Sequence, residues 1–312
     1  MSWQIRPIRL RYRLGPLTLL RLPLPFAVYD RHWSTLGGDG LSCTPPFETL
    51  PAEIVGAMIP ACPLPGVIPR VTLVPQAIRY APYQAPHHYL ELGGTFDGYL
   101  AKFSGKTRGT LRKKVRRLAD KAQLREFRQP DEMEEFHRLA RVVAKKTYQE
   151  RLLQAALPDD AAYLAEMRRL AGDDRARGYL LELEGAPIAY LWCPIQDGAV
   201  LYEHLGYDPA HRELSAGTVL LYLALERLFA EARFRLFDFT EGPGSHKELF
   251  ATHHVLTADV YFFRRTARGA SVVASHAALA SATRGGIALL ERSKLRDRLR
   301  KYLRLRHASE PT

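Results

Sequence analysis

Cysteine is scarce in this sequence of 312 residues, and its three positions form no framework. Cys43, Cys62 and Cys193 are odd in number and widely spaced, so they show neither the paired spacing of a zinc site nor the even count of a disulfide scaffold. We therefore expect reduced, mostly buried thiols, a cytoplasmic protein, and no metal cofactor.

A long uninterrupted apolar run is also absent. The most apolar segment near the N-terminus, residues 14–28, is broken by Pro16, Arg21, Pro23 and Pro25. It is too short to cross a bilayer, and no small-residue cleavage site follows it. The sequence therefore predicts neither a membrane span nor a secretory leader.

Acidic residues are the third deficit. There are 33 Asp and Glu against 45 Lys and Arg, which gives a formal net charge of +12. An excess of this size predicts an anionic partner, such as a phosphate-bearing cofactor, nucleic acid, an acidic glycan or an anionic membrane. The rest of the composition, with 46% hydrophobic and 25% charged residues, is that of a globular protein with one large or two small domains.

The first third of the chain predicts irregular β structure. Residues 3–24 alternate apolar side chains with arginines around a Gly15-Pro16 break, which indicates a β-hairpin. A proline-rich segment at 44–69 follows, and within it residues 48–59 could form a short helix. Two further strands are expected, at residues 71–74 and 89–92.

A basic helix is predicted at residues 103–122. Ser104 is suited to cap it, and Leu111, Val115 and Leu118 form a narrow apolar stripe. The rest of its surface is lysine and arginine with few acidic neighbours. A solvated charged face is one interpretation, and contact with phosphate or nucleic acid, favoured by the self-repulsion of the like charges, is the other.

From residue 123 onwards strands and helices follow one another. The expected elements are a strand at 123–128, helices at 131–146 and 159–170, a three-stranded meander at 179–209, a buried helix at 211–229, a strand at 235–240, a short helix capped by Ser245, and a strand at 255–263. Between the first two helices, Lys146 and Tyr148 either pack at a helix end or face a substrate. Residues 268–306 end in a basic amphipathic helix, which could lie on an anionic membrane or partner or stay solvated.

The segment at 235–250 combines a strand, a glycine-rich turn and a helix start. Asp238 and Glu241 precede the Gly242-Pro243-Gly244 turn, and Lys247 follows it. Two carboxylates and an amine at one end of a sheet are typical of the rim of a binding cleft in α/β folds. The alternative is an ordinary strand–turn–helix corner with a solvated lysine.

The residues before the buried helix suit a phosphate group. Small side chains at a helix start leave amide donors open, and the helix dipole there favours an anion. The segment from Arg212 to Gly217 resembles the Q/R-x-x-G-x-G/A loop of the GNAT N-acetyltransferases, with serine in place of the first glycine. The resemblance implies a cofactor pyrophosphate held by Arg212, Ser215, Ala216, Gly217 and Thr218.

The basic helix, the meander, this loop and FDFTEGPGSHKELFA occur in an order that is similar to the BioF2-like branch of the GNAT superfamily, over residues 96–265. CelD-type proteins of exopolysaccharide and cellulose synthesis typify that branch, and the FemAB peptidyltransferases, with two tandem GNAT-like halves, are related to it. The resemblance implies an α+β fold with a GNAT-like mixed sheet flanked by helices. It divides the chain into a β-rich region at 1–95, which would be a degenerate GNAT half, an acyltransferase domain at 96–266 and a basic tail at 267–312.

The implied reaction transfers an acyl group from acetyl-CoA, or another acyl-CoA, to an amine or hydroxyl. Such a reaction requires a base for the nucleophile, donors for the oxyanion and an acid for the departing thiolate. Glu203, in the third strand of the meander, is the first choice for the base, with Asp238 and Glu241 as alternatives. In a regular strand His204 would point away from Glu203, so only one of the two could face the cleft.

Lys247 would clamp an anionic substrate or transition state, although His246 stands where that branch has a tyrosine. Tyr207 and Tyr222 are candidate acids for the thiolate, or packing residues. Lys146, Tyr148 and Tyr207 complete the residues expected to contact the substrate. 

The leading function is therefore acyl transfer to a small-molecule or glycan-linked acceptor of cell-envelope or polysaccharide metabolism. The alternatives are a FemAB-like transferase that uses aminoacyl-tRNA, or a non-catalytic GNAT scaffold that binds an anionic membrane or nucleic acid. The cytoplasmic protein would contact the inner membrane peripherally through its C-terminal basic helix.

Overall fold

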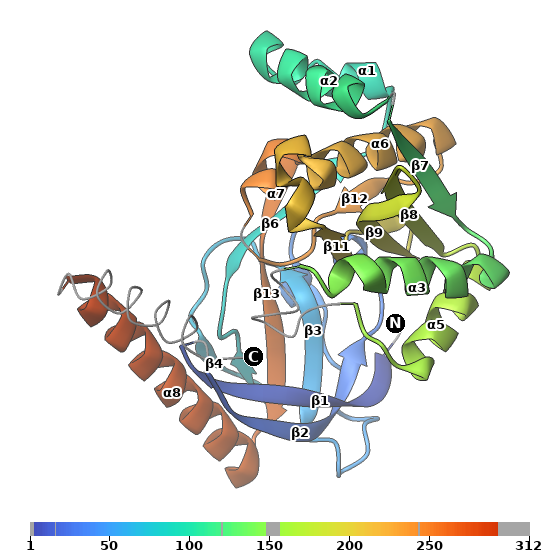
Figure 1. The fold of residues 1–312 in the computed structure, drawn as a ribbon. Helices are drawn as coiled ribbons and strands as arrows, with labels where there is room; N and C mark the ends of the chain where they lie inside the picture. The colour runs from blue at the N-terminus through green and yellow to red at the C-terminus, as the bar shows by residue number, and fades with distance from the viewer. Residues whose placement is uncertain (1–2, 16, 120, 148–156, 243, 293–312) are drawn as a thin grey trace, which may run out of the picture. The chain divides into compact units, whose positions relative to one another are not determined.

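Two units, each with its own set of strands, make up the computed structural model, which describes residues 3–15, 17–119, 121–147, 157–242 and 244–292 (Figure 1). One unit comprises residues 1–85 and 256–312, and the other comprises residues 86–255. Tyr148 and the basic residues between 294 and 306 lie outside the described residues. No helix in the described ranges is long and apolar enough to cross a membrane.

The unit boundaries differ from the divisions at 95 and 266 that the sequence suggests. Strand β6 (Ala85–Glu91) pairs with β12 (Leu236–Asp238), which places residues 86–95 with the acyltransferase-like unit. Residues from Leu256 onwards belong with the N-terminal region, because β13 (His253–Arg264) pairs there with β3 (Gly56–Pro63). Chain position alone does not reveal such pairings.

The N-terminal unit begins with the expected hairpin, in which β1 (Trp3–Leu14) and β2 (Leu17–Tyr29) run side by side (Figure 1). Strand β2 continues into a parallel pairing with β3. The helix proposed for residues 48–59 is wrong, because residues 56–63 form this central strand between β2 and β13. The remaining elements of the unit are β4 (Val71–Val74), β5 (Ala77–Tyr80), the single-turn helices η1 (Trp33–Leu36) and η2 (Gly40–Ser42), and α8 (Ala267–Arg292).

Helix α8 packs on one face of this sheet. Val273 is buried there with Leu10 and Leu24 of the hairpin. The hydroxyl of Tyr80 lies 2.6 Å from Nδ1 of His276, inside the same layer. The hairpin is therefore held against α8 by apolar packing at Leu10 and Leu24.

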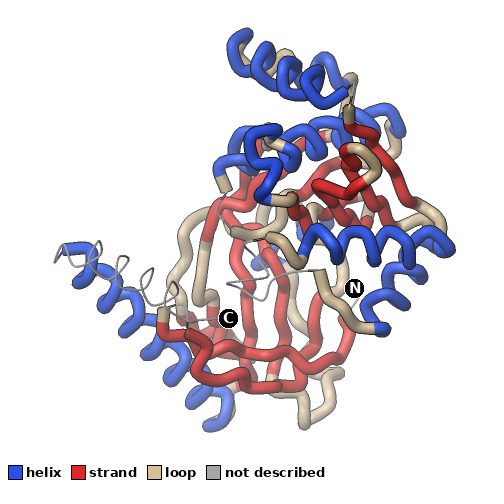
Figure 2. Tube along the Cα trace, viewed as in Figure 1, coloured by secondary structure: helices blue, strands red, loops and turns tan. Residues whose placement is uncertain are grey.

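The unit of residues 86–255 is an α+β structure with a mixed sheet flanked by helices, as the sequence predicts (Figure 2). The strand order is β6-β12-β10-β9-β8-β7, and β11 pairs with β9. Only β10 and β12 are parallel to each other among these pairs. The strands not yet bounded are β7 (Ala122–Phe127), β8 (Ala176–Leu183), β9 (Ala186–Gln196), β10 (Ala199–Leu201) and β11 (His204–Tyr207).

Each face of this sheet carries its own core. The first contains side chains of α1 (Phe96–Leu100), α2 (Gly105–Ala119), α6 (Ala216–Glu231) and α7 (Ser245–Phe250). The second contains α3 (Met133–Ala144) and α5 (Ala161–Gly172). In α2, Ser104 accepts a hydrogen bond from the Thr107 amide at 3.2 Å, and Leu111 and Leu118 are buried, as their spacing predicts. The short helices η3 (Pro130–Glu132) and η4 (Pro209–Leu214) precede α3 and α6.

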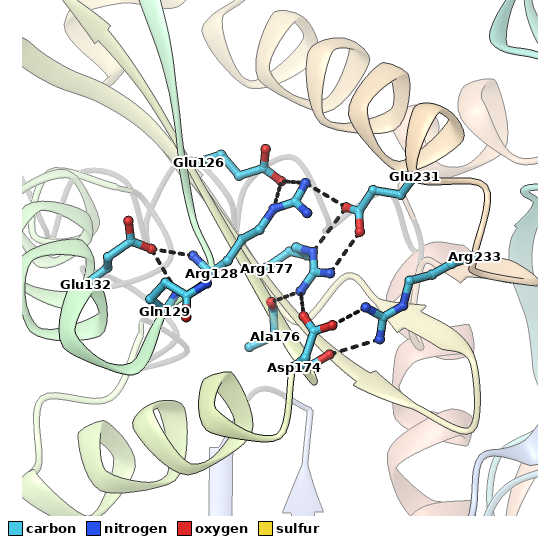
Figure 3. A network of polar contacts seen from close by, with 9 residues as sticks. All are labelled: Glu126, Arg128, Gln129, Glu132, Asp174, Ala176, Arg177, Glu231 and Arg233. Carbon is cyan, nitrogen blue, oxygen red and sulfur yellow. Dashed lines mark hydrogen bonds and ion pairs between the residues drawn. The ribbon is translucent and has the colours of Figure 1, made fainter.

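Helix α6 is anchored at its C-terminal end by a buried ion-pair network (Figure 3). The side chain of Arg177 is 1% exposed, and its guanidinium donates to Glu231, the last residue of α6, at 2.8 and 3.1 Å. It also donates to Asp174 at 2.8 Å. Arg128 and Arg233 extend the network to Glu231 and Asp174 respectively. This end of the helix is thereby fixed against β8.

Candidate active site

The third strand of the meander is interrupted, which opens the sheet. Residues 199–209 were expected to form one strand, but β10 and β11 are separated by Tyr202 and Glu203. Their register against β9 shifts by one residue, because Val200 pairs with Ile195 whereas His204 pairs with Trp192. Such a shift is a β-bulge, which bends the strand and ends its pairing on one side. Beyond the bulge β11 follows β9 alone, while β12 pairs with β10 only as far as Asp238.

A cavity of about 340 Å³ lies beside this opening. Its walls come from the bulge and β11, from the first turns of α6, and from α7. The lining residues used below are Tyr202, Leu205, Tyr207, Gly217, Thr218 and His246. The cavity therefore brings together residues that are distant in the sequence, such as Tyr202 and His246, which are 44 residues apart.

Two glycines permit the close packing of this region. A Cβ atom on Gly206 would lie 2.4 Å from Cε1 of Tyr190, which no side chain can accommodate without movement. A Cβ atom on Gly217 would lie 3.3 Å from both Leu205 and Tyr207. Any larger side chain at residue 217 must therefore displace these residues or extend into the cavity.

The start of α6 exposes its first turn to the cavity. Ser215 has φ 54° and ψ 39°, a left-handed conformation that ends η4 and redirects the chain into α6. Because the first amides of a helix have no acceptor within it, the backbone at Ala216 and Gly217 can serve an external anion. The side chain of Arg212 is exposed, and it makes no ion pair with any residue that the structure describes. The loop thus keeps the donors expected from the sequence.

Tyr202 and His246 form a pair at the cavity wall that the sequence analysis missed. The hydroxyl of Tyr202 lies 3.1 Å from Nε2 of His246. Burial raises the pKa of Tyr202, so its hydroxyl keeps its proton at neutral pH. Burial, with a smaller effect of Lys247, lowers the pKa of His246. The pair therefore consists of a neutral O–H and a neutral imidazole, which can pass a proton between them or to a bound group.

Lys247 lies behind this pair rather than among the lining residues. It is 7% exposed, and Nζ donates to the carbonyl oxygens of Glu241 at 2.8 Å and Thr240 at 3.3 Å. Its Nζ lies 5.8 Å from the centre of the Tyr202 ring. Burial lowers the pKa of Lys247, and Asp238 and Glu241 oppose that shift. These contacts stabilise the glycine-rich turn and place the Lys247 amine against the ring of Tyr202.

Asp238 is also buried beneath the turn. Its carboxylate lies 2.5 Å from Nε2 of His87, and both side chains are 3% exposed. The same carboxylate accepts the amide of Thr240 at 2.5 Å. Asp238 is therefore not among the residues that line the cavity, and its contacts hold the end of β12. Glu241 is exposed on the turn.

Glu203 and His204 both contact Tyr163 of α5. The Tyr163 hydroxyl donates to Glu203 at 3.4 Å, and its ring meets that of His204 edge-on at 6.1 Å. The expectation that the two side chains would point to opposite faces is thus not met, because the bulge breaks the alternation of the strand. Protein atoms around the Glu203 carboxylate raise its pKa, because they displace water that would stabilise the charged form. Hydrogen bonds from Tyr163 and Trp192 oppose this shift. Burial lowers the pKa of His204 to about 4.

The residues expected to contact the substrate are separated in the structure. Tyr207 lines the cavity and is 43% exposed. Lys146 lies outside the lining and donates to Asp208 at 2.7 Å, which ties the end of α3 to the loop before α6. Tyr222 packs edge-on against Phe96 with ring centres 5.0 Å apart, so it is a core residue. 

The structure thus brings Tyr207, Gly217 and Thr218 to one cavity and places Asp238, Lys146 and Lys247 in supporting contacts. Tyr202 had one detectable signal, since it directly precedes the candidate base in LYEHLGY. Across the described ranges no group of three His, Cys, Asp or Glu side chains is placed to hold a metal ion.

Comparison with known proteins agrees with this geometry. Residues 105–248, which include α2, the bulge, the start of α6 and most of α7, match the model of the family described as Acetyltransferase (GNAT) domain. This segment therefore resembles a GNAT acetyltransferase domain. The family resemblance inferred from the residues is thereby confirmed, and the GNAT domain supports acyl transfer as the general reaction.

Solved structures are also similar to this chain. The crystal structure of FemX is similar over 84% of this chain and 88% of its own, with 12% identity and a TM-score of 0.52. L-PGS from Bacillus licheniformis is similar over 71% of this chain and 72% of its own, with 13% identity and a TM-score of 0.43. At such low identity the FemX likeness shows a shared fold. No curated protein matches the chain.

Proposed function

We propose that the GNAT domain transfers an acyl group from acyl-CoA to an amine or hydroxyl of a small acceptor. The observation that carries the proposal is the cavity between the bulge and the first turn of α6, which Gly217 and Thr218 line from one side and Tyr202 from another. A helix start favours a diphosphate, and a concave cleft suits the arm of the cofactor. The pyrophosphate of the donor would then contact the start of α6, and its thioester would contact the wall that includes Tyr202.

The residues present can divide the chemistry among them. The amides of Ala216 and Gly217, with Arg212 ahead of them, would hold the pyrophosphate. As the new bond to the acceptor forms and the carbon–sulfur bond breaks, the hydroxyl of Tyr202 would donate its proton to the departing sulfur. The imidazole of His246, 3.1 Å from that hydroxyl, would orient it and help to restore the proton.

Glu203 remains the predicted base for the acceptor's proton. Its raised pKa brings the carboxyl closer to the pH at which it can both take and release a proton. It does not line the cavity, so a water molecule would have to relay the proton. The acceptor that we propose, following the sequence resemblance, is a cell-envelope or polysaccharide-related metabolite.

A FemAB-like transfer from aminoacyl-tRNA is the second candidate, and two observations favour it. The FemX-like fold spans 84% of the chain. Helix α2 also presents an exposed basic surface that includes Lys106, Lys113, Arg116 and Arg117. A nucleic-acid partner would use that surface, whereas a CoA donor would not require it.

Thermal unfolding in the presence of CoA or tRNA distinguishes the donors. We expect CoA to raise the Tm, since a ligand at a hundred times its Kd stabilises a protein by about 2.7 kcal/mol. Gly217→Glu should abolish this shift, because its carboxylate would meet the pyrophosphate, while the isosteric Gly217→Gln should retain more of it. A Tm that responds to tRNA but not to CoA would replace the proposal by the second candidate. A response to neither would leave a non-catalytic scaffold.

A further inference from the structure

The tip of the N-terminal hairpin exposes an unusual concentration of leucine. We call Leu14, Leu17, Leu19 and Leu20 the hairpin tip. Their side chains are 45%, 64%, 58% and 53% exposed, respectively. They surround the turn at Gly15, and Leu14 pairs directly with Leu17. Scattered exposed apolar residues are ordinary, but a contiguous exposed group marks an interaction site.

Four arginines accompany the hairpin tip. Arg9, Arg11 and Arg13 alternate along β1 and so share one face, and Arg21 of β2 pairs directly with Arg11 on that face. We call these four residues the arginine face. All four are exposed, and within the described residues none forms an ion pair. Like charges placed opposite each other across two strands are destabilising, so this arrangement is unfavourable for the free protein.

The two features become favourable together at an anionic lipid surface. Leucine side chains lose their contact with water in the interfacial region of a bilayer, and arginines bind the lipid phosphates. Long arginine side chains can reach the headgroups while their apolar stems stay near the leucines. A nucleic acid would satisfy the arginine face but would give no reason for four exposed leucines at the same end of the hairpin. The leucines therefore favour the membrane.

We propose that the β1–β2 hairpin docks on anionic membranes tip first, with the hairpin tip entering the interface and the arginine face binding phosphate headgroups. The hairpin is suited to this role because α8 holds β1 close to the turn, where Thr283 donates to the carbonyl oxygen of Arg13 at 3.1 Å. Tyr12 bonds to Ser275 at 3.0 Å, and His276 contacts the carbonyl oxygen of Arg11 at 3.1 Å. The ribbon is thus anchored up to the residue before Leu14, which fixes the hairpin tip on a rigid support. The inference stands independently of the proposed reaction.

The test is co-sedimentation of the full chain with vesicles of phosphatidylcholine, alone or mixed with phosphatidylglycerol. We expect binding to the mixed vesicles that weakens with salt. Arg11→Gln combined with Arg21→Gln should lower the partition coefficient by roughly 25-fold, since each basic residue near an anionic surface is worth about fivefold. Leu17→Ser combined with Leu20→Ser should lower it on the order of tenfold, through lost apolar burial.

Matched controls come from the same unit. Leu73→Ser removes an apolar side chain that is 68% exposed on β4, and Arg268→Gln removes an exposed arginine at the start of α8. Both should bind vesicles like the wild type. The arginine double variant should also keep or raise its Tm, because it relieves the repulsion between Arg11 and Arg21.

Two results would overturn the inference. Wild-type binding by the leucine double variant would show that another basic segment makes the membrane contact. Binding of tRNA that depends on the arginine face but not on the hairpin tip, without vesicle binding, would assign the face to nucleic acid.

Discussion

The two ends of helix α6 differ in the charge state of the side chains around them. At the C-terminal end, burial alone would lower the pKa of Arg177, but the hydrogen bonds that it donates to Glu231 and Asp174 raise that pKa, so the charged form is favoured (Figure 3). At the N-terminal end, burial lowers the pKa of His246 and raises that of Tyr202, so the neutral forms are favoured. Paired charges close one end of the helix, and neutral, proton-exchanging groups line a cavity at the other. The proposed reaction is therefore assigned to the N-terminal end, and the ion pairs fix the C-terminal end in place.

The largest effect on stability is expected from removing the ion pairs at the C-terminal end of α6. Arg177→Met should lower the free energy of unfolding by about 3 kcal/mol or more, because it removes the buried guanidinium that pairs with both Glu231 and Asp174. Arg169→Met is the matched control, since Arg169 also binds two carboxylates but its side chain is 53% exposed. We expect the control to unfold at nearly the same urea concentration as the wild type, because exposed ion pairs add little stability. Urea denaturation measures both values, and equal losses would contradict the assignment of rigidity to Arg177.

A smaller effect, confined to turnover, is expected at the open end. Tyr202→Phe should lower kcat about 100-fold while leaving the Kd for CoA nearly unchanged, because only the proton donor is removed. Tyr222→Phe serves as the control, since Tyr222 packs in the core against Phe96. Steady-state kinetics and CoA titration give the two readouts. Similar kcat values for the two variants would exclude Tyr202 as the proton donor.

Loss of a supporting contact should also affect kcat and CoA affinity to different extents. Lys247→Ala should lower kcat more than it lowers CoA affinity, because Lys247 supports the turn beneath Tyr202 rather than lining the cavity. We expect a loss of about tenfold in kcat, within the usual effect of a displaced acid–base group. Equal losses in kcat and affinity would assign Lys247 to the cofactor instead. Lys247→Met, which keeps the length of the side chain without its charge, tests whether the amine itself is required.

The smallest effect is a pH dependence of stability near the cavity. Because the pKa of His204 in the folded protein is about 4, against an ordinary value of 6.5, the unfolded chain takes up its proton first as the pH falls. The contribution of His204 is therefore complete above pH 6.5 and is lost progressively between pH 6.5 and 4. His204→Gln should flatten this part of the profile of unfolding free energy. An unchanged profile would show that other groups govern it.

Local periodicity predicted much of the fold. The alternation at residues 3–24 predicts the β1–β2 hairpin, and the spacing of Leu111 and Leu118 predicts α2. The β-bulge was not predictable in this way, because LYEHLGY has the composition of one continuous strand. Its interruption depends on the different partners that β10 and β11 find in β12 and β9.

Some residues of the candidate site were likewise predictable from the sequence, and others were not. Small residues at the start of α6 are visible as Ser215, Ala216 and Gly217, because a helix start has a local signature. The partnership of Tyr202 with His246 is not visible, since it requires α7 to pack against the opened sheet. The role of Asp238 was likewise unpredictable from its neighbours, because its buried partner His87 comes from β6.

The sequence alone determined the excess of positive charge, the main helices and strands, and a phosphate-compatible helix start, because each depends on residues close together in the chain. The tertiary structure decided where the sheet opens, which tyrosine meets the cavity and which charges are buried. These outcomes depend on strand register and burial, which are set by residues far apart in the chain.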